Sequence, residues 1–248
     1  MTWFSDSLVI AWRDILKGLR ERSRLLGAVV RAIIWLFVLG SGLRPVVQSV
    51  GGDYLAFLFP GIIIMNVLFS GVMSGTSIIW DREFGFLKEI LVAPVSRTSI
   101  ILGKTLGGTL LATFHGCMVL CLFPFVGGNF SALQLLGALP GMFLTAFAVT
   151  ALGMLIATRM RSFDGFGTIN NFVVMPLFFL SGAMYPVDRV PSWIGTLTRL
   201  DPVHYGVDLV RGAMFSHLTL TQTAFDVGAL AGFSALFLIP AVLLFGGE

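Results

Sequence analysis

The chain has 248 residues, of which 56% are hydrophobic and only 12% are charged, whereas roughly a quarter of the residues of a soluble domain carry charge. This composition excludes an ordinary soluble domain and predicts a membrane protein. The formal net charge of +3 is too small to indicate nucleic-acid binding. Cys117 and Cys121 lie four residues apart within an apolar run, which is typical of helix packing rather than of a disulfide or a metal site.

The first predicted element is an amphipathic helix over residues 5–20. Such a helix lies in the plane of the membrane interface, with Trp12 at headgroup depth. A solvated coiled-coil helix or a core helix is the alternative. Its apolar face and its charged face are formed by Leu8, Trp12, Ile15, Leu16 and Leu19 and by Asp6, Arg13, Asp14, Lys17 and Arg20, respectively.

Six apolar segments then follow, each with about 20 or more residues, which is enough to cross ~30 Å of hydrocarbon. The sequence therefore predicts an all-α membrane domain over residues 1–248. Twelve Lys and Arg residues flank one side of the predicted spans and four flank the other, so the side with twelve, and with it both termini, is expected in the cytoplasm. The predicted spans are 25–43, 55–79, 99–125, 133–157, 163–184 and 221–245.

A charged segment separates the second and third spans, and such a segment has to face water. Its apolar side chains recur at helical spacing, and Pro94 ends the pattern. We therefore expect a short cytoplasmic helix over 81–94 that another protein holds; an ordinary cytoplasmic turn is the alternative. The residues expected to make that contact are Asp81, Arg82, Glu83, Phe84, Leu87 and Lys88.

A long segment, residues 185–220, joins the last two spans on the outer side. A helix is expected to begin near Trp193, and Asp201 as N-cap with Pro202 at the first helical position is expected to begin a second one, with Tyr205 on its apolar side. Neither helix is long enough to span the membrane. The pattern favours a re-entrant hairpin, and two helices lying flat on the outer surface are the alternative.

Four GxxxG pairs occur, and this spacing allows helices to pack closely. Because roughly three such pairs are expected by chance at this glycine content, they receive little weight here. The pairs are Gly71/Gly75, Gly103/Gly107, Gly137/Gly141 and Gly228/Gly232.

Ionisable residues at membrane depth are typical of ion-coupled transporters, and this chain has few of them. Arg31, Asp81, Lys104, Asp164 and Asp226 are all expected near span ends, within snorkelling reach of water. Only His115 is expected well inside a span, and a lone histidine there is more often a packing residue than a proton relay. The sequence thus shows no evident proton or sodium coupling.

The chain also has no ATPase site by its sequence. Residues 103–105 read Gly-Lys-Thr, but Thr98 stands where a phosphate-binding loop needs its first glycine, and the segment opens a membrane helix instead of following a strand. We therefore expect any work to be powered by another subunit. No cofactor is expected in this chain, and ATP and Mg²⁺ would belong to the partner.

An intramembrane enzyme is the alternative of a different class. The three histidines lie on different segments without an HExxH pattern, so no catalytic or metal-binding residue is predicted. His204, Asp208 and Arg211 are one helical turn apart, and a solvated helical charge pattern explains them without a site. A structural anchor remains a further alternative, and so does a channel, although nothing resembles a selectivity filter.

Two segments resemble ABC-2 type exporter permeases. The signature segment of that family is similar to WDREFGFLKEILVAPVSRTSIILGKTLGG here, and the region after its fifth span is similar to FLSGAMYPVDRVPSWIGTLTRLDPVHYGVDLVRGAM. The resemblance covers essentially the whole chain in length, span number and order. It favours the multidrug and antibiotic-resistance branch over the O-antigen and teichoic acid branch.

The resemblance implies a homodimer of six-span subunits in a bacterial cytoplasmic membrane, docked to two copies of a separately encoded ATP-binding-cassette subunit. It implies that residues 81–94 form the coupling helix, which seats in a groove of the ATPase subunit. It also implies that residues 185–220 form the re-entrant element that closes the extracellular exit of the transport path. The expected cargo is lipophilic or amphipathic, with a lipid-linked polysaccharide as the alternative. A path between copies of the second and fifth spans would be lined by Asn66, His115, Asn170 and Asn171, unless these side chains only form interhelical hydrogen bonds.

Overall fold

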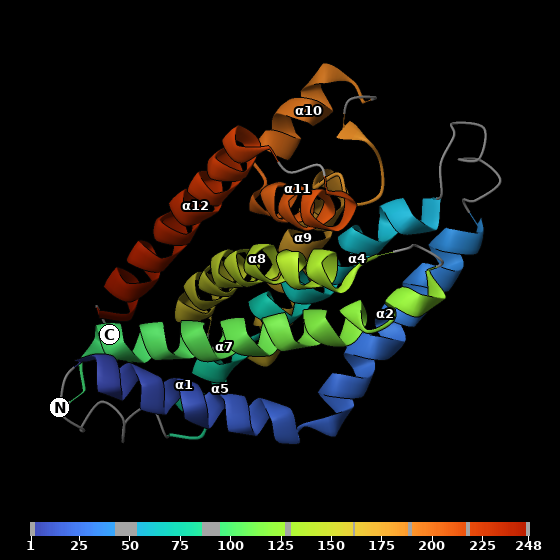
Figure 1. The fold of residues 1–248 in the computed structure, drawn as a ribbon. Helices are drawn as coiled ribbons and strands as arrows, with labels where there is room; N and C mark the ends of the chain where they lie inside the picture. Colours follow the sequence, from blue (N-terminus) through green and yellow to red (C-terminus); the bar gives the residue numbers. More distant parts are fainter. Residues whose placement is uncertain are drawn as a thin grey trace.

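The computed structural model describes residues 3–42, 54–85, 95–126, 130–160, 162–187, 190–216 and 219–246, and every regular element within these ranges is a helix (Figure 1). The elements are α1 (Trp3–Arg20), α2 (Arg22–Gly42), α4 (Tyr54–Met73), α5 (Thr76–Glu83), α7 (Arg97–Leu120), the short 3-10 helix η2 (Phe123–Phe125), α8 (Ala132–Arg159), α9 (Phe163–Leu180), α10 (Ser192–Arg199), α11 (Pro202–Phe215) and α12 (Leu220–Gly246).

Six stretches of these helices are long and apolar enough to cross a membrane, which confirms the all-α class and the six predicted spans. They are Arg22–Gly40, Tyr54–Glu83, Arg97–Phe125, Ala132–Arg159, Phe163–Leu180 and Leu220–Phe245.

Two predicted span boundaries are wrong. The span over 55–79 breaks at Ser74 and Gly75 and then continues as α5 to Glu83. The span over 163–184 ends at Leu180, because Gly182 adopts a left-handed backbone with φ of 75° and stops the helix.

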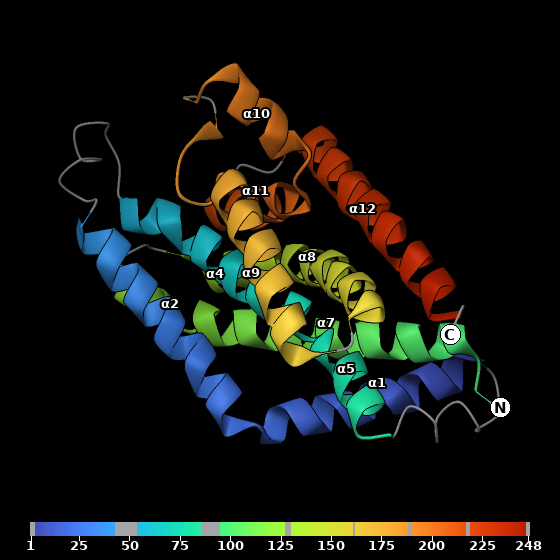
Figure 2. The ribbon, with the colours of Figure 1, turned by 180° about the vertical axis from the view of Figure 1, so that it is seen from behind.

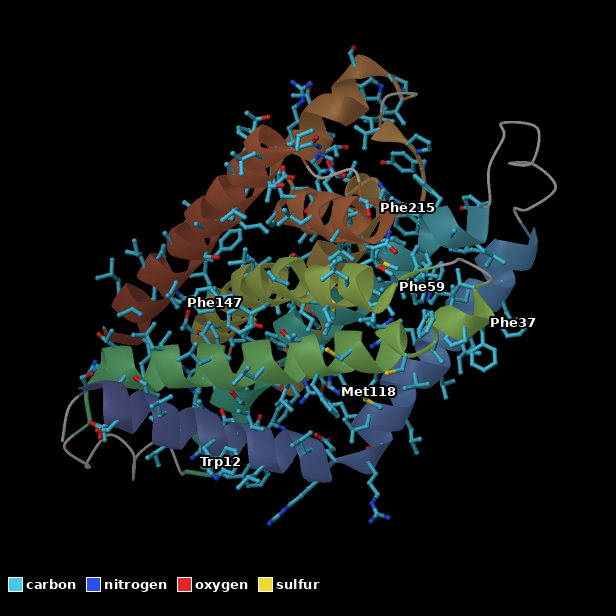
Figure 3. All side chains as sticks on the ribbon, in the orientation of Figure 1. Trp12, Phe37, Phe59, Met118, Phe147 and Phe215 are labelled. Carbon is cyan, nitrogen blue, oxygen red and sulfur yellow. The ribbon has the colours of Figure 1, made fainter. Side chains whose placement is uncertain are left out.

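The core of the bundle is built around α4 and α8. Within the chain, 83% of the most apolar stretch of Tyr54–Glu83 is buried, against 17% of that of Leu220–Phe245. Phe59 lies fully buried in the interior, whereas Phe37 on α2 points away from the bundle and is 73% exposed (Figure 3). Helices α2 and α12 flank opposite sides of the bundle in both views (Figures 1 and 2). Their apolar outer faces need lipid or another protein to cover them.

Close helix packing depends on two of the four GxxxG pairs, so giving all four little weight was wrong. A Cβ on Gly75 would lie 2.3 Å from the carbonyl oxygen of Gly153 in α8, and one on Gly103 would lie 2.6 Å from that of Ser7 in α1. A Cβ on Gly228 or Gly232 would have no neighbour within 4 Å among the described residues. Because only a residue without Cβ fits such contacts, the glycines set how closely α5 approaches α8 and α7 approaches α1.

Helix α1 runs beside the first half of α7 (Figure 1). Its buried residues are small or polar, including Ser7, Ala11 and Asp14. The predicted apolar face carries Trp12, which is 62% exposed. Both termini lie at one end of the bundle and α10 lies at the opposite end (Figures 1 and 2).

Candidate functional site

A buried lysine lies at the centre of the polar contacts near the termini. Ser96 begins α7 by accepting a hydrogen bond from the backbone N–H of Ser99 at 3.0 Å, and this places Lys104 two turns further on, facing α5. The Lys104 ammonium donates to Asp81 Oδ2 at 2.5 Å and lies 3.6 Å from Asp14 Oδ2. Its side chain is fully buried, so the expectation that Lys104 snorkels to water is wrong.

Arg13 completes this group by binding both carboxylates. Its Nη2 lies 2.9 Å from Asp14 Oδ1 and 3.1 Å from Asp81 Oδ2. The charge cluster, formed by Arg13, Asp14, Asp81 and Lys104, therefore joins α1, α5 and α7 and has no net formal charge. Burying such ions is costly unless every charge has its partners, so the cluster strongly favours one arrangement of the three helices.

A polar seam continues from the cluster along α4. Ser74 donates to the Ser70 carbonyl oxygen at 2.9 Å, and the Ser70 hydroxyl lies 2.5 Å from His115 Nδ1 on α7. One turn further, Asn66 accepts from Arg31 Nε on α2 at 3.3 Å and donates to the Ile62 carbonyl oxygen. The seam comprises Ser74, Ser70, His115, Asn66 and Arg31, and it links α2, α4 and α7 inside the spans.

The structure does not bring the four predicted path residues to one place. Asn66 and His115 are buried in the seam, where Asn66 binds Arg31 and His115 binds Ser70 through Nδ1, while His115 Nε2 has no hydrogen-bond partner among the described residues. Asn170 and Asn171 lie on α9, where Asn171 is exposed and Asn170 is buried. Asn170 Oδ1 has no hydrogen-bond partner among the described residues.

The predicted ATPase-contact residues also divide into two groups. Asp81 is turned into the charge cluster, and Arg82 donates to the carbonyl oxygens of Met160 and Thr158 at the end of α8. Glu83 is exposed, and the exposed Phe84 ring stacks on Trp80 with 4.7 Å between ring centroids. The structure describes four of the six predicted contact residues, and of these four only Glu83 and Phe84 face outward.

The predicted helix over 81–94 has the wrong start. Asp81, Arg82 and Glu83 belong to α5, which continues the second span and ends at Glu83, with Gly85 in a left-handed conformation at φ 75°. Leu87 and Lys88 lie outside the described residues.

At the opposite end the predicted helix starts are confirmed. Asp201 caps α11 by accepting from the Val203 N–H at 2.8 Å, with Pro202 in the first turn. Tyr205 donates to the Arg199 carbonyl oxygen at 2.6 Å, while Trp193 on α10 is 64% exposed. Burial raises the pKa of the Asp201 carboxyl to about 8, although the Val203 N–H lowers it.

Helix α11 packs against other helices of the bundle, and its Val207 and Val210 are fully buried. The re-entrant hairpin expected for residues 185–220 stays a prediction. Arg211 donates to the carbonyl oxygens of Gly182 and Ala183, and its guanidinium lies 4.1 Å from the Phe57 ring centroid. Burial lowers the pKa of Arg211 to about 10, although Asp208 raises it. His204, Asp208 and Arg211 form only weak ion pairs along one helix, at 3.7 and 4.0 Å.

Sequence reasoning missed Arg13 and Lys104 as partners of Asp81, and it missed Asp14 as a further partner of Lys104. Arg13 and Asp81 are 68 positions apart, and Lys104 and Asp81 are 23 apart. A lysine and an aspartate at matching depths of successive spans were the only available signal.

Six spanning helices with buried polar contacts between them define a polytopic membrane protein. The family described as ABC-2 type transporter matches residues 6–215, and the chain belongs to this family. This membership confirms the resemblance seen in the sequence. It makes the chain a multi-pass transport permease of a class that works with an ABC ATPase.

Curated relatives match over most of their lengths. Nodulation protein J of Rhizobium leguminosarum bv. trifolii is 31% identical over 239 residues, which cover 95% of this chain and 88% of that protein. The putative transport permease ycf38 of Cyanophora paradoxa is 25% identical over 220 residues, covering 87% and 76%. The putative transport permease ycf38 of Porphyra purpurea is 29% identical over 206 residues, which cover 80% of this chain and 70% of that protein. These names do not test the multidrug branch, which stays a prediction.

Proposed function

We propose that this chain is the permease subunit of an exporter that is driven by a separate ATP-binding-cassette subunit. One observation carries the proposal: α5 prolongs the second span, presents Glu83 and Phe84 outward at its tip, and is held by the charge cluster on its other side. A partner that pushes on this tip acts on several helices at once.

The proposed force path follows the contacts of α5. The charge cluster ties α5 to α1 and α7, and the hydrogen bonds from Arg82 tie it to the end of α8. Gly75 and Gly153 bring α5 and α8 into close contact. A push on α5 therefore moves these helices together as a rigid body, which is the kind of motion that domain rearrangements use.

A second copy of the chain is proposed to pack against the side formed by α2 and α9. These helices are adjacent, since the rings of Trp35 and Phe178 are 5.9 Å apart. Both are peripheral, and α9 presents Asn171 among apolar neighbours. Because α4 is buried within the chain, a path wall formed by the second span does not fit, and α2 takes its place in the proposal.

The proposed orientation places both termini in the cytoplasm of a bacterial cell. The charge bias of twelve against four supports it, and so does the position of both termini at one end of the bundle. The cargo is proposed to be lipophilic or amphipathic because the spans carry few polar interruptions. A lipid-linked polysaccharide remains the second candidate, since its lipid end meets the same requirement.

The coupling proposal is tested with the double variant E83A/F84A, reconstituted with the ATPase subunit. Truncating two contact residues at the centre of an interface removes on the order of 2 kcal/mol or more, so we expect stimulation of ATP hydrolysis to fall at least tenfold. Because both side chains are exposed, the fold should be unaffected.

The matched control removes an aromatic and a charged side chain at the opposite end, as W193A/R199A. This variant should keep its ATPase coupling. Unchanged coupling in E83A/F84A would exclude the proposed contact.

A further inference from the structure

An open pocket of about 720 Å³ lies where α1 turns into α2 and faces α5, α7 and α9. We call it the elbow pocket and define it by Lys17, Arg20, Arg24, Leu111, Trp80 and Phe163. The turn between α1 and α2 is visible in Figure 1, and Glu21 is the residue between the two helices in the sequence. The pocket is lined by residues from the starts of α2, α5 and α9, and it lies at the same end of the bundle as both termini (Figure 1).

The rim of the pocket carries surplus positive charge. Four basic and two acidic residues line it, and Lys104 is already held by the charge cluster. Glu21 lies 3.9 Å from Arg24. Among the described residues no acidic side chain forms an ion pair with Lys17 or Arg20, and the Lys17 ammonium lies 4.9 Å from the Trp80 ring centroid. An anion binding here would meet two cations whose charge is not neutralised.

One part of the lining, which we call the floor, is apolar and aromatic, while Ser74, Ser77, Asp14 and Lys104 line the pocket elsewhere. The rings of Trp80 and Phe163 are 5.2 Å apart, and Met73 and Leu111 extend this surface inward. Such a floor suits an acyl or prenyl chain, and the cationic rim suits a headgroup with negative charge. A free phosphate would leave the floor empty, whereas the choline of a zwitterionic lipid would be repelled by the rim.

We propose that the elbow pocket binds an anionic amphiphile with a phosphate headgroup, with the headgroup at Lys17 and Arg20 and the chain on Trp80 and Phe163. This inference names the headgroup chemistry of the amphipathic class proposed above, and it rests on the proposed function only for its link to transport.

The test measures lipid binding to the full chain in detergent by native mass spectrometry, without ATP or an ATPase subunit. Phosphatidylglycerol is the anionic probe and phosphatidylcholine the zwitterionic one. We expect phosphatidylglycerol to bind at least tenfold more tightly. In K17Q/R20Q this affinity should fall roughly 10- to 30-fold, since each basic residue contributes about three- to fivefold.

The matched control R22Q/R159Q removes the same charge from exposed residues that do not line the pocket. It should keep the affinity for phosphatidylglycerol. An equal loss in both double variants would overturn the site, and so would equal binding of both lipids.

A competition arm separates the two sources of phosphate. Inorganic phosphate at millimolar concentration should leave bound phosphatidylglycerol in place. If inorganic phosphate displaces the lipid, the pocket recognises free phosphate, and the proposal of an amphiphile is overturned. Since no ATPase is present, a negative result here is distinct from failure of the coupling test on Glu83 and Phe84.

Discussion

The two ends of the bundle satisfy their buried ionisable groups in different ways. Near the termini, Lys104 is neutralised by carboxylates from two other helices. Near α10, Arg211 donates to the carbonyl oxygens of Gly182 and Ala183, which follow α9, and Asp201 accepts from the backbone of its own helix. One end depends on ion pairs between helices, and the other on hydrogen bonds to backbone groups.

This difference separates two structural tasks. Ion pairs between α1, α5 and α7 favour one arrangement of the three helices, because displacing α5 or α7 leaves a buried charge without its closest partner, and displacing α1 removes a contact from both Lys104 and Asp81. Backbone hydrogen bonds at α11 instead fix how a connecting segment follows its span. We call the end near the termini the inner end and the end near α10 the outer end, after the orientation proposed above. The inner end is suited to transmit the proposed push among helices, and the outer end to hold a short helix in place.

The largest expected effect is the loss of the buried lysine. Lys104→Met keeps much of the apolar stem but leaves Asp14 and Asp81 with Arg13 as their only described cation. Removing one partner of a buried ion pair costs about 3–5 kcal/mol, so we expect a large fall in the thermal midpoint in detergent or a loss of expression.

The double variant K104M/D81L provides the control. It removes the opposite charges together, and Arg13, whose side chain is 36% exposed, retains Asp14 and access to water. We expect it to be more stable than K104M alone. A double variant at least as damaged as K104M would contradict the charge cluster as a coupled unit.

The sequence allowed good predictions where the physics is local. Asp201 followed by Pro202 predicts a helix start because the cap and the first turn involve adjacent residues. The six spans are equally local, since each is a continuous apolar run. These features need no knowledge of what lies beside them in space.

Features that depend on a partner helix were not predictable. In the sequence, Lys104 is only a residue near the end of a predicted span. Its position opposite Asp81 in the structure makes it a buried, paired ion. The four GxxxG pairs look alike in the sequence, yet Gly75 meets Gly153 whereas Gly228 meets nothing. A GxxxG pair packs closely only where another helix approaches it. The spacing of two glycines within one segment does not show whether another helix approaches.

A smaller effect is expected at the outer end. Arg211→Met removes the donor to the carbonyl oxygens of Gly182 and Ala183 while preserving contact with Phe57. Hydrogen bonds that involve a charged group contribute about 1.5–3 kcal/mol, so the thermal midpoint should fall less than in K104M.

Arg211→Lys is the matched variant, because it keeps one cationic donor and should recover part of the loss. If R211M is destabilised as strongly as K104M, the contrast between the two ends is lost.

A further expected effect is a dependence on pH at Asp201, which lies outside the six candidate spans. Burial raises the pKa of its carboxyl from 3.8 to about 8, so the folded chain keeps this proton where the unfolded chain has lost it. Folding takes up one proton within this window, and stability contributed by the protonated carboxyl declines as the pH rises from about 4 to about 8. Asp201→Asn removes this titration and preserves the cap, since Asn is an equally good N-cap.

We therefore expect D201N to unfold near the wild-type midpoint at about pH 5 and at a higher midpoint at about pH 8.5, when both are measured in the same detergent. Asp201 Oδ2 is buried without a hydrogen-bond partner among the described residues, so ionisation places a charge where nothing compensates it. Asp164→Asn removes an exposed carboxylate and controls for net charge. A midpoint difference between D201N and the wild type that stays constant across the two pH values would show that Asp201 is ionised in the folded chain. The outer end would then hold a buried charge on one backbone N–H alone, and its contrast with the paired charges of the inner end would become sharper.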